Sequence, residues 1–205
     1  MKLYYAPGAC SMGIHIILEE IGASYELVKL DLKGGEQHRL PFSEINPKGK
    51  VPTLVRDDGM VLTEYPVIAY YLAETHATTG LLPSDDDAAL QSAAAIDYCV
   101  ATIHMQGFAR QFRPENFAPG GNVDAVKQQG RDTAEKGFGI MSKLLGTKDY
   151  VAGTYSLGDT ALFYVEFWAR NRTGMTLPPN LAAHLNRMLH RPAVQRMLAQ
   201  EGIAA

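Results

Sequence analysis

A stretch near the N-terminus, residues 3–22, constrains the fold most, because it changes from strand to helix within a few residues. Residues 3–5 are β-prone, the chain breaks at Pro7-Gly8, and apolar side chains recur at helical spacing over 14–21. A second β-prone run follows at 25–30. A strand, a helix and a second strand in this order predict a βαβ unit with parallel strands.

Two further strand signals complete the first domain. A polar segment, 31–42, predicts a loop with a short helix, and a proline-containing strand follows at 51–55. Asp57-Asp58-Gly59 is typical of a hairpin turn into an antiparallel strand at 60–62. Pro66 suits the first position of a helix. The order β-α-β-α-β-β-α predicts a mixed four-stranded sheet flanked by helices, an α+β domain.

Composition changes after residue 77, where strand signals become sparse. We therefore predict a first domain over 1–77, a linker over 78–87 and an all-helical domain over 88–205. The helices expected in that domain cover 88–113, 123–145, a segment that Ser156 and Asp159 cap at its start, one near 181–189 and one from Pro192.

Composition also limits the partners. The formal net charge of −3 gives no basic footprint for nucleic acid, and no apolar run approaches the roughly 20 residues of a membrane span. We see no signal peptide. Two cysteines make no disulfide framework, so we expect a reducing, cytoplasmic setting. No His, Cys, Asp or Glu set has metal-ligand spacing, and Cys99 and His104, five apart, are not expected to share a helix face.

Cys10 lies in the turn before the first helix, where unpaired N–H groups and the helix dipole lower a thiol pKa. Position 13, where a Cys-x-x-Cys motif has its second thiol, is Gly13. A reactive Cys10 therefore works with an external thiol or orients one. The alternative is a small buried cysteine that only packs.

Four segments, in this order and spacing, give the chain a family resemblance. They are Tyr5 with the turn Ala6-Pro7-Gly8-Ala9-Cys10-Ser11, the loop 46–52, Leu62-Thr63-Glu64 before a helix, and Ser156-Leu157-Gly158-Asp159. Over essentially its whole length the chain resembles the glutathione S-transferases, and most of all the bacterial beta class. This implies a thioredoxin-like N-terminal domain, a helical C-terminal domain, and glutathione as co-substrate.

The resemblance also implies a glutathione site. Pro52 would follow a cis bond that exposes the backbone of Val51 to the cysteinyl part of the peptide. Glu64 and Tyr65 would hold the γ-glutamyl end at a helix N-terminus. The full set that the resemblance implies is Lys33, Lys48, Val51, Pro52, Glu64 and Tyr65. The family usually has Ser or Gly at position 65, so Tyr65 departs from the family's hydroxyl contact and keeps only its backbone N–H for the ligand. Glu64 is also a typical first-turn acid.

The catalytic residues implied are Cys10, Tyr5, Ser11 and His104. Tyr5 or Ser11 would donate to a bound thiolate, although a tyrosine at a strand end also often packs. His104 matches the family's active-site histidine when the helix is aligned from its start. Aligned from its end, Met105 takes that place, and a single helical histidine is often structural.

A mixed apolar and cationic acceptor pocket is expected from Arg110, Phe112, Arg113 and Phe117, which equally fit a helix end with its usual basic residues. The leading hypothesis is a homodimeric transferase that conjugates the glutathione thiolate to small, largely apolar electrophiles. One alternative is a glutathione-dependent thiol–disulfide oxidoreductase that uses Cys10. The other is a binding protein that keeps this fold without catalysis.

Overall fold

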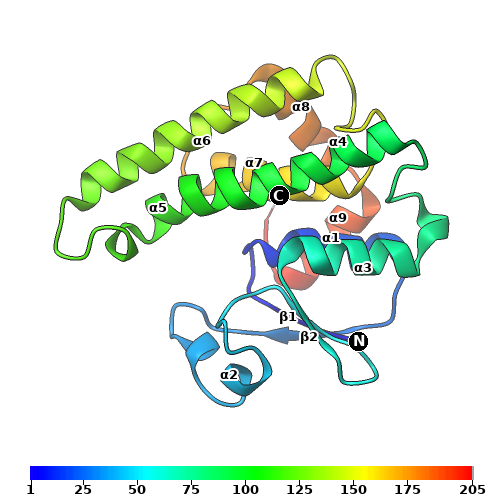
Figure 1. Cartoon of the computed structure of the whole chain (residues 1–205), viewed down its shortest axis with the longest axis horizontal. Coiled ribbons are helices and arrows are strands. Elements are labelled where there is room, and N and C mark those ends of the chain that lie inside the picture. The colour runs from blue at the N-terminus through cyan, green and yellow to red at the C-terminus, as the bar shows by residue number, and fades with distance from the viewer. Residues whose placement is uncertain (205) are drawn as a thin grey trace. The chain divides into compact units, whose positions relative to one another are not determined.

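The computed structural model describes residues 1–204 and divides into two compact units. The first unit comprises Met1–Leu82 together with Met188–Ala205, and the second comprises Pro83–Arg187 (Figure 1). The division falls inside the predicted linker. The C-terminal segment, which the sequence analysis placed in the helical domain, groups instead with the first unit.

The first unit is built on the predicted four-stranded sheet. Its strands are β1 (Lys2–Tyr5), β2 (Glu26–Lys29), β3 (Thr53–Val55) and β4 (Val61–Thr63), in the spatial order β2-β1-β3-β4. The pair β1–β2 is parallel, as the βαβ pattern predicts, and β1–β3 and β3–β4 are antiparallel. The mixed sheet and its helices confirm the thioredoxin-like fold.

Helices cover both faces of the sheet (Figure 1). They are α1 (Ser11–Ile21) and α3 (Tyr65–Thr75) on one face and α2 (Phe42–Ile45) on the other. Alternation along β1 explains the two layers, because successive side chains point to opposite faces. Leu3 is fully buried, and the ring of its neighbour Tyr4 lies 5.2 Å from the ring of Phe42 in α2.

The last helix, α9 (Pro192–Glu201), packs along α1 within the first unit. Two ion pairs hold it there, Arg191–Glu20 at 2.8 Å and Arg196–Glu19. Apolar packing accompanies these charges, since α9 buries Val194. The helix predicted from Pro192 is thus confirmed, but in the other unit.

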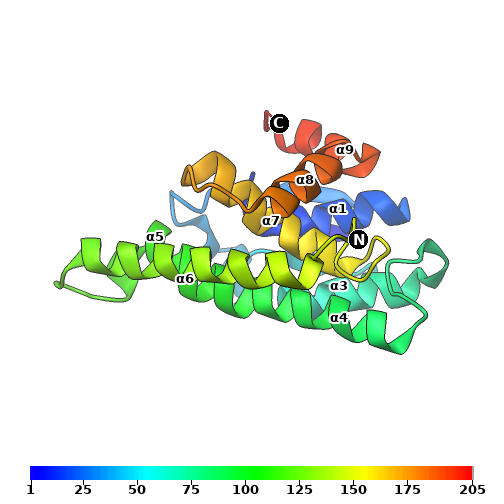
Figure 2. The same cartoon turned by 90° about the horizontal axis from the view of Figure 1, so that it is seen from above.

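The second unit is helical. Its elements are α4 (Asp86–Asp97), a π-helix (Tyr98–Phe108), α5 (Ala109–Phe112), α6 (Val123–Leu145), α7 (Leu157–Arg172) and most of α8 (Pro179–Leu189). In this unit α6 runs beside the π-helix and α5 (Figure 2). Within residues 1–204 no helix is both long and apolar enough to span a membrane.

The long helix predicted over 88–113 is present but changes its winding. Its central turns are π-helical, with hydrogen bonds from residue i to i+5. Residues five apart are joined by one hydrogen bond of a π-helix, so Cys99 and His104 lie closer in phase than they would in an α-helix. Burial, with smaller contributions from the Glu166 and Asp159 carboxylates, raises the pKa of the Cys99 thiol well above its usual value. Cys99 is therefore an unreactive packing thiol.

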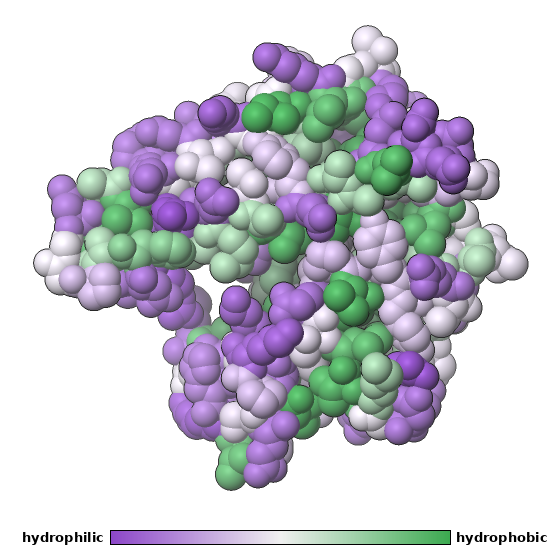
Figure 3. All heavy atoms as spheres, viewed as in Figure 1, coloured by the Kyte–Doolittle hydropathy of each residue, from purple (hydrophilic) through white to green (hydrophobic). Residues whose placement is uncertain are grey.

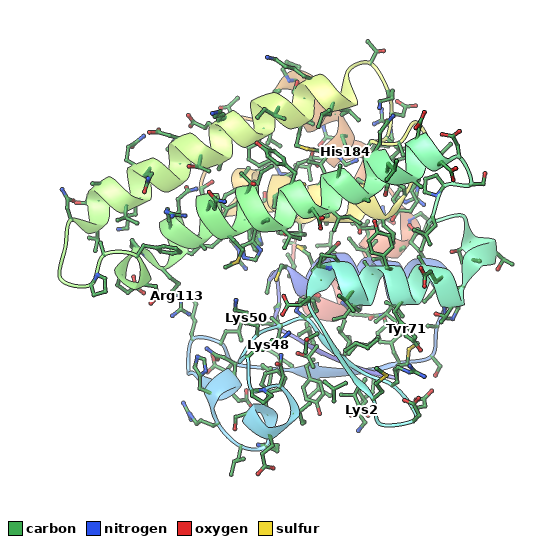
Figure 4. The ribbon with its side chains drawn as sticks, in the orientation of Figure 1. Lys2, Lys48, Lys50, Tyr71, Arg113 and His184 are labelled. Carbon is green, nitrogen blue, oxygen red and sulfur yellow. The ribbon has the colours of Figure 1, made fainter. Side chains whose placement is uncertain are left out.

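A buried ionic cluster fixes the start of α7. Asp159 accepts from the backbone N–H of Ser156 and of Val151, both at 2.8 Å, which confirms the predicted cap. His184 of α8 lies between two carboxylates, with Nδ1 2.8 Å from Glu166 and Nε2 3.2 Å from Asp159. All three side chains are fully buried (Figure 4 labels His184).

Candidate functional site

Cys10 is at the N-cap position of α1, as its place in the sequence predicts. It is half-buried, and its Sγ lies 3.3 Å from the carbonyl oxygen of Val51, to which the thiol donates. The Val51-Pro52 bond is cis, as the resemblance implied. The thiol and the backbone expected to hold a peptide ligand therefore meet at one point of the first unit.

The two hydroxyls predicted beside Cys10 are both buried. Ser11 is completely enclosed, and its Oγ lies 3.4 Å from both the N–H and the carbonyl oxygen of Ala6, so it closes the turn. Tyr5 is 6% exposed and packs edge-on against the His15 ring. Burial, assisted by the Glu201 carboxylate, raises the pKa of Tyr5, so its phenol stays protonated.

Asn46 organises the loop that leads to Pro52. Its Nδ2 donates to the carbonyl of Lys50 at 2.9 Å and to the hydroxyl of Thr53 at 2.8 Å, and its Oδ1 accepts from the Lys48 N–H. Asn46 itself is only 2% exposed. Three buried or half-buried hydrogen bonds from one side chain thus set the path of the backbone before the cis bond.

Glu64 marks the γ-glutamyl end of the predicted site. Its backbone has a positive φ of 68°, which is unusual for a residue other than glycine. Its carboxylate pairs with Lys48 Nζ at 2.7 Å, and the same ammonium donates to Thr63 at 2.8 Å. Figure 4 shows Lys48 and Lys50 on the loop that precedes β3. Both partners of the Lys48–Glu64 pair are about half exposed, so the pair is open to a ligand.

Tyr65 does not face outward as a serine hydroxyl would; it is buried against α1. A Cβ added to Gly13 would lie 2.3 Å from the Tyr65 hydroxyl and 2.8 Å from its ring. The two departures noted in the sequence, a glycine in place of the second thiol and a tyrosine in place of serine, therefore fit each other sterically. A cysteine at position 13 has no room beside this ring.

We expect Gly13→Ala to lower the free energy of unfolding by about 1–3 kcal/mol through overpacking. Without the clash, the change would gain up to about 1 kcal/mol in a helix. In a Tyr65→Ser background the loss should disappear. Gly139→Ala is the control, because a Cβ there meets nothing within 4 Å. Urea denaturation of wild type, Gly13→Ala, Tyr65→Ser and the double variant measures the coupling, and an equal effect of Gly13→Ala in both backgrounds would refute it.

The C-terminal helix reaches the Cys10 turn. One oxygen of Glu201 accepts from the Gly8 N–H at 2.8 Å, and the other lies 2.9 Å from Nδ1 of the buried His15. His15 Nε2 continues the network to Tyr25 and Gln200. Gly8 and Glu201 are 193 residues apart, so nothing in the local sequence could have indicated this contact.

The second unit places His104 on the π-helix. Its Nδ1 is 3.4 Å from the Tyr164 hydroxyl, and its ring packs edge-on against Trp168 at 4.7 Å. It is half-buried, whereas Met105 is exposed. Within this unit His104 belongs to an aromatic cluster, and Met105 does not.

The four predicted acceptor residues lie in three different settings. Arg110 stacks over the ring of Phe117 at 4.6 Å, and Phe112 packs on Phe108 and Trp168. Arg113 is exposed at the end of α5. In the first unit, Lys33 is exposed in the polar turn after β2.

Comparisons with known proteins agree with this geometry. Residues 1–74 match the model of the glutathione S-transferase N-terminal domain. The chain is 34% identical to the glutathione S-transferase GstA of Escherichia coli O157:H7, over 99% of this chain and 100% of that protein. The chain belongs to the glutathione S-transferase family.

Solved structures of the family resemble the whole chain. The beta-class glutathione S-transferase of Sphingomonas chungbukensis is 32% identical, with a TM-score of 0.87 and full coverage of both chains. A glutathione transferase homologue from Sulfitobacter, solved with bound glutathione, is 29% identical with a TM-score of 0.90, over 99% of this chain and 98% of that one.

Two residues of this glutathione S-transferase support the candidate site and were not in the predicted set. Asn46 binds the backbone of the loop before Pro52, and Glu201 binds the backbone of the turn before Cys10. Asn46 stood in a segment that the sequence marked as a turn, where asparagine is common, so its buried role gave no separate signal. Glu201 carried no signal at all.

Proposed function

We propose that the first unit binds glutathione along Val51 and that the bound thiolate attacks a small electrophile. The observation that supports this most is the convergence of three features: the Cys10 turn, the backbone of Val51 and the carboxylate of Glu64. Val51 lies outside β3, so its backbone can pair with an extended peptide in the manner of an added strand.

Each end of glutathione would meet a matching group. Glu64 faces the ammonium of the γ-glutamyl residue, and the N-terminus of α3 offers N–H groups to its carboxylate. Lys48, already paired with Glu64 at 2.7 Å, would supply a cation to a ligand carboxylate. Lys33 is the further cation in the predicted set.

The chemistry is a nucleophilic substitution or addition. The glutathione thiol gives its proton to water, and the sulfur lone pair forms a bond to the electrophilic carbon. With an aryl halide, the carbon–halogen bond then breaks and halide leaves. The N-terminus of α1 stabilises negative charge beside Cys10, while Ser11, whose hydroxyl is held by Ala6, keeps the turn closed.

A second activity is favoured by the position of Cys10. Its thiol touches the carbonyl that would hold the cysteinyl residue of glutathione. A Cys10 thiolate there would attack glutathione disulfide, break its S–S bond and release one glutathione thiolate, leaving a mixed disulfide on the protein. With Gly13 in place of a second thiol, the reaction stops at that adduct.

The proposed function is tested by conjugation of glutathione to chlorodinitrobenzene. The wild-type chain should show saturable rates above the uncatalysed reaction. Glu64→Gln should raise KM for glutathione by about tenfold, the value of one charge-assisted hydrogen bond. Glu74→Gln is the matched control, because Glu74 is exposed near the end of α3, the helix that Glu64 precedes. Absence of catalysis by the folded wild type would reject the proposal.

We also propose a homodimer in the cytoplasm. Exposed apolar side chains support association: Val67 of α3 and Met60 before β4 in the first unit, and Leu90 and Leu144 in the second. Figure 3 shows hydrophobic atoms at the surface over α3 and the neighbouring hairpin. Neither Cys10 nor Cys99 forms a disulfide, which suits a reducing compartment. Light scattering that returns the 22.4 kDa of one chain would contradict the dimer.

A further inference from the structure

We propose that the helical unit contains a second binding site, for a phosphate monoester that carries a planar ring. A cavity of about 310 Å³ opens between α5, the first turns of α6 and the end of α7. All of its lining residues lie in the second unit: Gln111, Phe112, Asp124, Lys127, Gln128, Arg131, Arg172 and Thr173. None of them belongs to the predicted glutathione site, and Phe112 alone is shared with the predicted acceptor pocket.

Three cations converge on this cavity. Lys127 and Arg131 are four residues apart on α6 and therefore share one face of the helix, and Arg172 ends α7. Among the described lining residues, Asp124 is the one acid. The cavity is thus positive in a chain whose formal net charge is −3, which favours an anionic ligand.

Lys127 and Arg131 keep donors for a ligand. Lys127 Nζ is 3.8 Å from Asp124, at the limit of an ion pair, and Asp124 is 89% exposed. Arg131 pairs with Glu135 through Nε at 3.0 Å, and a guanidinium has two further amino groups. Planar guanidinium groups bind phosphate oxygens in pairs. Several cations around one small cavity suit a dianion better than a monoanion.

An aromatic surface completes the site. Phe112 lines the cavity, and the Arg172 guanidinium lies 5.7 Å from the ring centres of both Phe112 and Trp168. Phe112 is half-buried, so a flat ring of the ligand can pack against the exposed part of the Phe112 side chain while its phosphate meets the cations. The volume is at the lower end of small-molecule sites, enough for one ring and one phosphate.

The site can be tested without glutathione. Trp168 is the only tryptophan of the chain and contacts the Phe112 ring at 5.4 Å, so its fluorescence reports on this cavity. Phenyl phosphate should give a saturable change. Benzenesulfonate, with one charge, and inorganic phosphate, with no ring, should each bind about tenfold more weakly. Equal binding of either one would overturn the ligand class proposed, and no saturable response to phenyl phosphate would overturn the site.

Variants on one helix locate the binding. Lys127→Gln and Arg131→Gln should each weaken phenyl phosphate about tenfold, the effect of one charge-assisted hydrogen bond. Asp124→Asn should tighten binding, because it removes the opposing charge. Lys136→Gln, on α6 outside the cavity lining, is the matched control and should change nothing. Unchanged affinity in both cavity variants would refute the proposal, whether or not the chain conjugates glutathione.

Discussion

Replacing His184 with alanine is expected to lower the free energy of unfolding by about 3–5 kcal/mol, because it leaves two buried carboxylates without their counter-charge. The imidazole lies 2.8 Å from Glu166 and 3.2 Å from Asp159, and all three groups are fully buried. Among the described residues, the second oxygen of Glu166 has no hydrogen-bond partner. Urea denaturation followed by Trp168, on the same helix as Glu166, measures the loss.

Two further variants test whether the loss of stability comes from the uncompensated charges. The double variant His184→Ala/Glu166→Ala should be more stable than His184→Ala alone, because it no longer buries the Glu166 charge without a counter-charge. His38→Ala, at an exposed position, should stay within about 0.5 kcal/mol of wild type. If the two single changes at the buried sites simply add in the double variant, the ionic account of this cluster is incorrect.

The same cluster makes stability depend on pH. Burial opposes the charged imidazolium, but the Glu166 charge and the hydrogen bond to Asp159 outweigh it and raise the pKa of His184 to about 10. Because this folded pKa is above the unfolded value of about 6.5, the stabilisation is complete below about pH 6.5 and is lost as pH rises through about 10. Burial also raises the pKa of Glu166, so this carboxyl likewise makes stability fall as pH rises, but in a lower pH range.

The measurement compares wild type and His184→Ala in urea at about pH 7 and about pH 10. The difference between their free energies of unfolding should shrink at the higher pH. Other groups titrate in this range in both proteins, so only the difference reports on His184. A difference that stays constant or grows with pH would show that His184 is not charged in the folded protein.

Replacing Cys10 with alanine is expected to abolish the mixed disulfide with glutathione while leaving conjugation within about tenfold of wild type. The redox reaction needs the Cys10 sulfur itself. Conjugation needs only a stabilised glutathione thiolate, and the N-terminal amides of α1 remain after the change. The Cys10 sulfur is therefore required for the redox reaction and not for conjugation.

The separation is measured on the same samples. Intact mass after treatment with glutathione disulfide should show one adduct on wild type and none on Cys10→Ala. Cys99→Ala should keep the adduct, because Cys99 is fully buried and burial raises its thiol pKa. Conjugation lost together with the adduct would make Cys10 essential to both reactions. An adduct that persists in Cys10→Ala would move the redox site elsewhere.

Sequence patterns predicted the elements that local chemistry determines. The strand–turn–helix at Cys10, the cap formed by Ser156 and Asp159, and the helix from Pro192 each follow from spacing and turn residues within a few positions. The π-helical winding was not predicted, since the apolar pattern of an Ala-rich segment does not distinguish it from an α-helix.

Contacts between distant segments were beyond such patterns. Glu201 reaches Gly8 across nearly the whole chain, and this contact accompanies α9 into the first unit. Tyr65 was identified as a departure from the family, but its fit over Gly13 needed coordinates. Ser11 was predicted as a donor because of its neighbour Cys10, and only the fold shows that its hydroxyl is held by Ala6.

The central claim is that glutathione binds through Val51 and Glu64, and calorimetric titration tests it most directly. Glutathione should release heat with a single saturable site. The dipeptide Cys-Gly, which lacks the γ-glutamyl residue, should bind at least about tenfold more weakly, because it makes no contact with Glu64. Glu64→Gln should remove most of this difference between the two ligands. No heat from either ligand, or equal affinity for both on the wild type, would contradict the account.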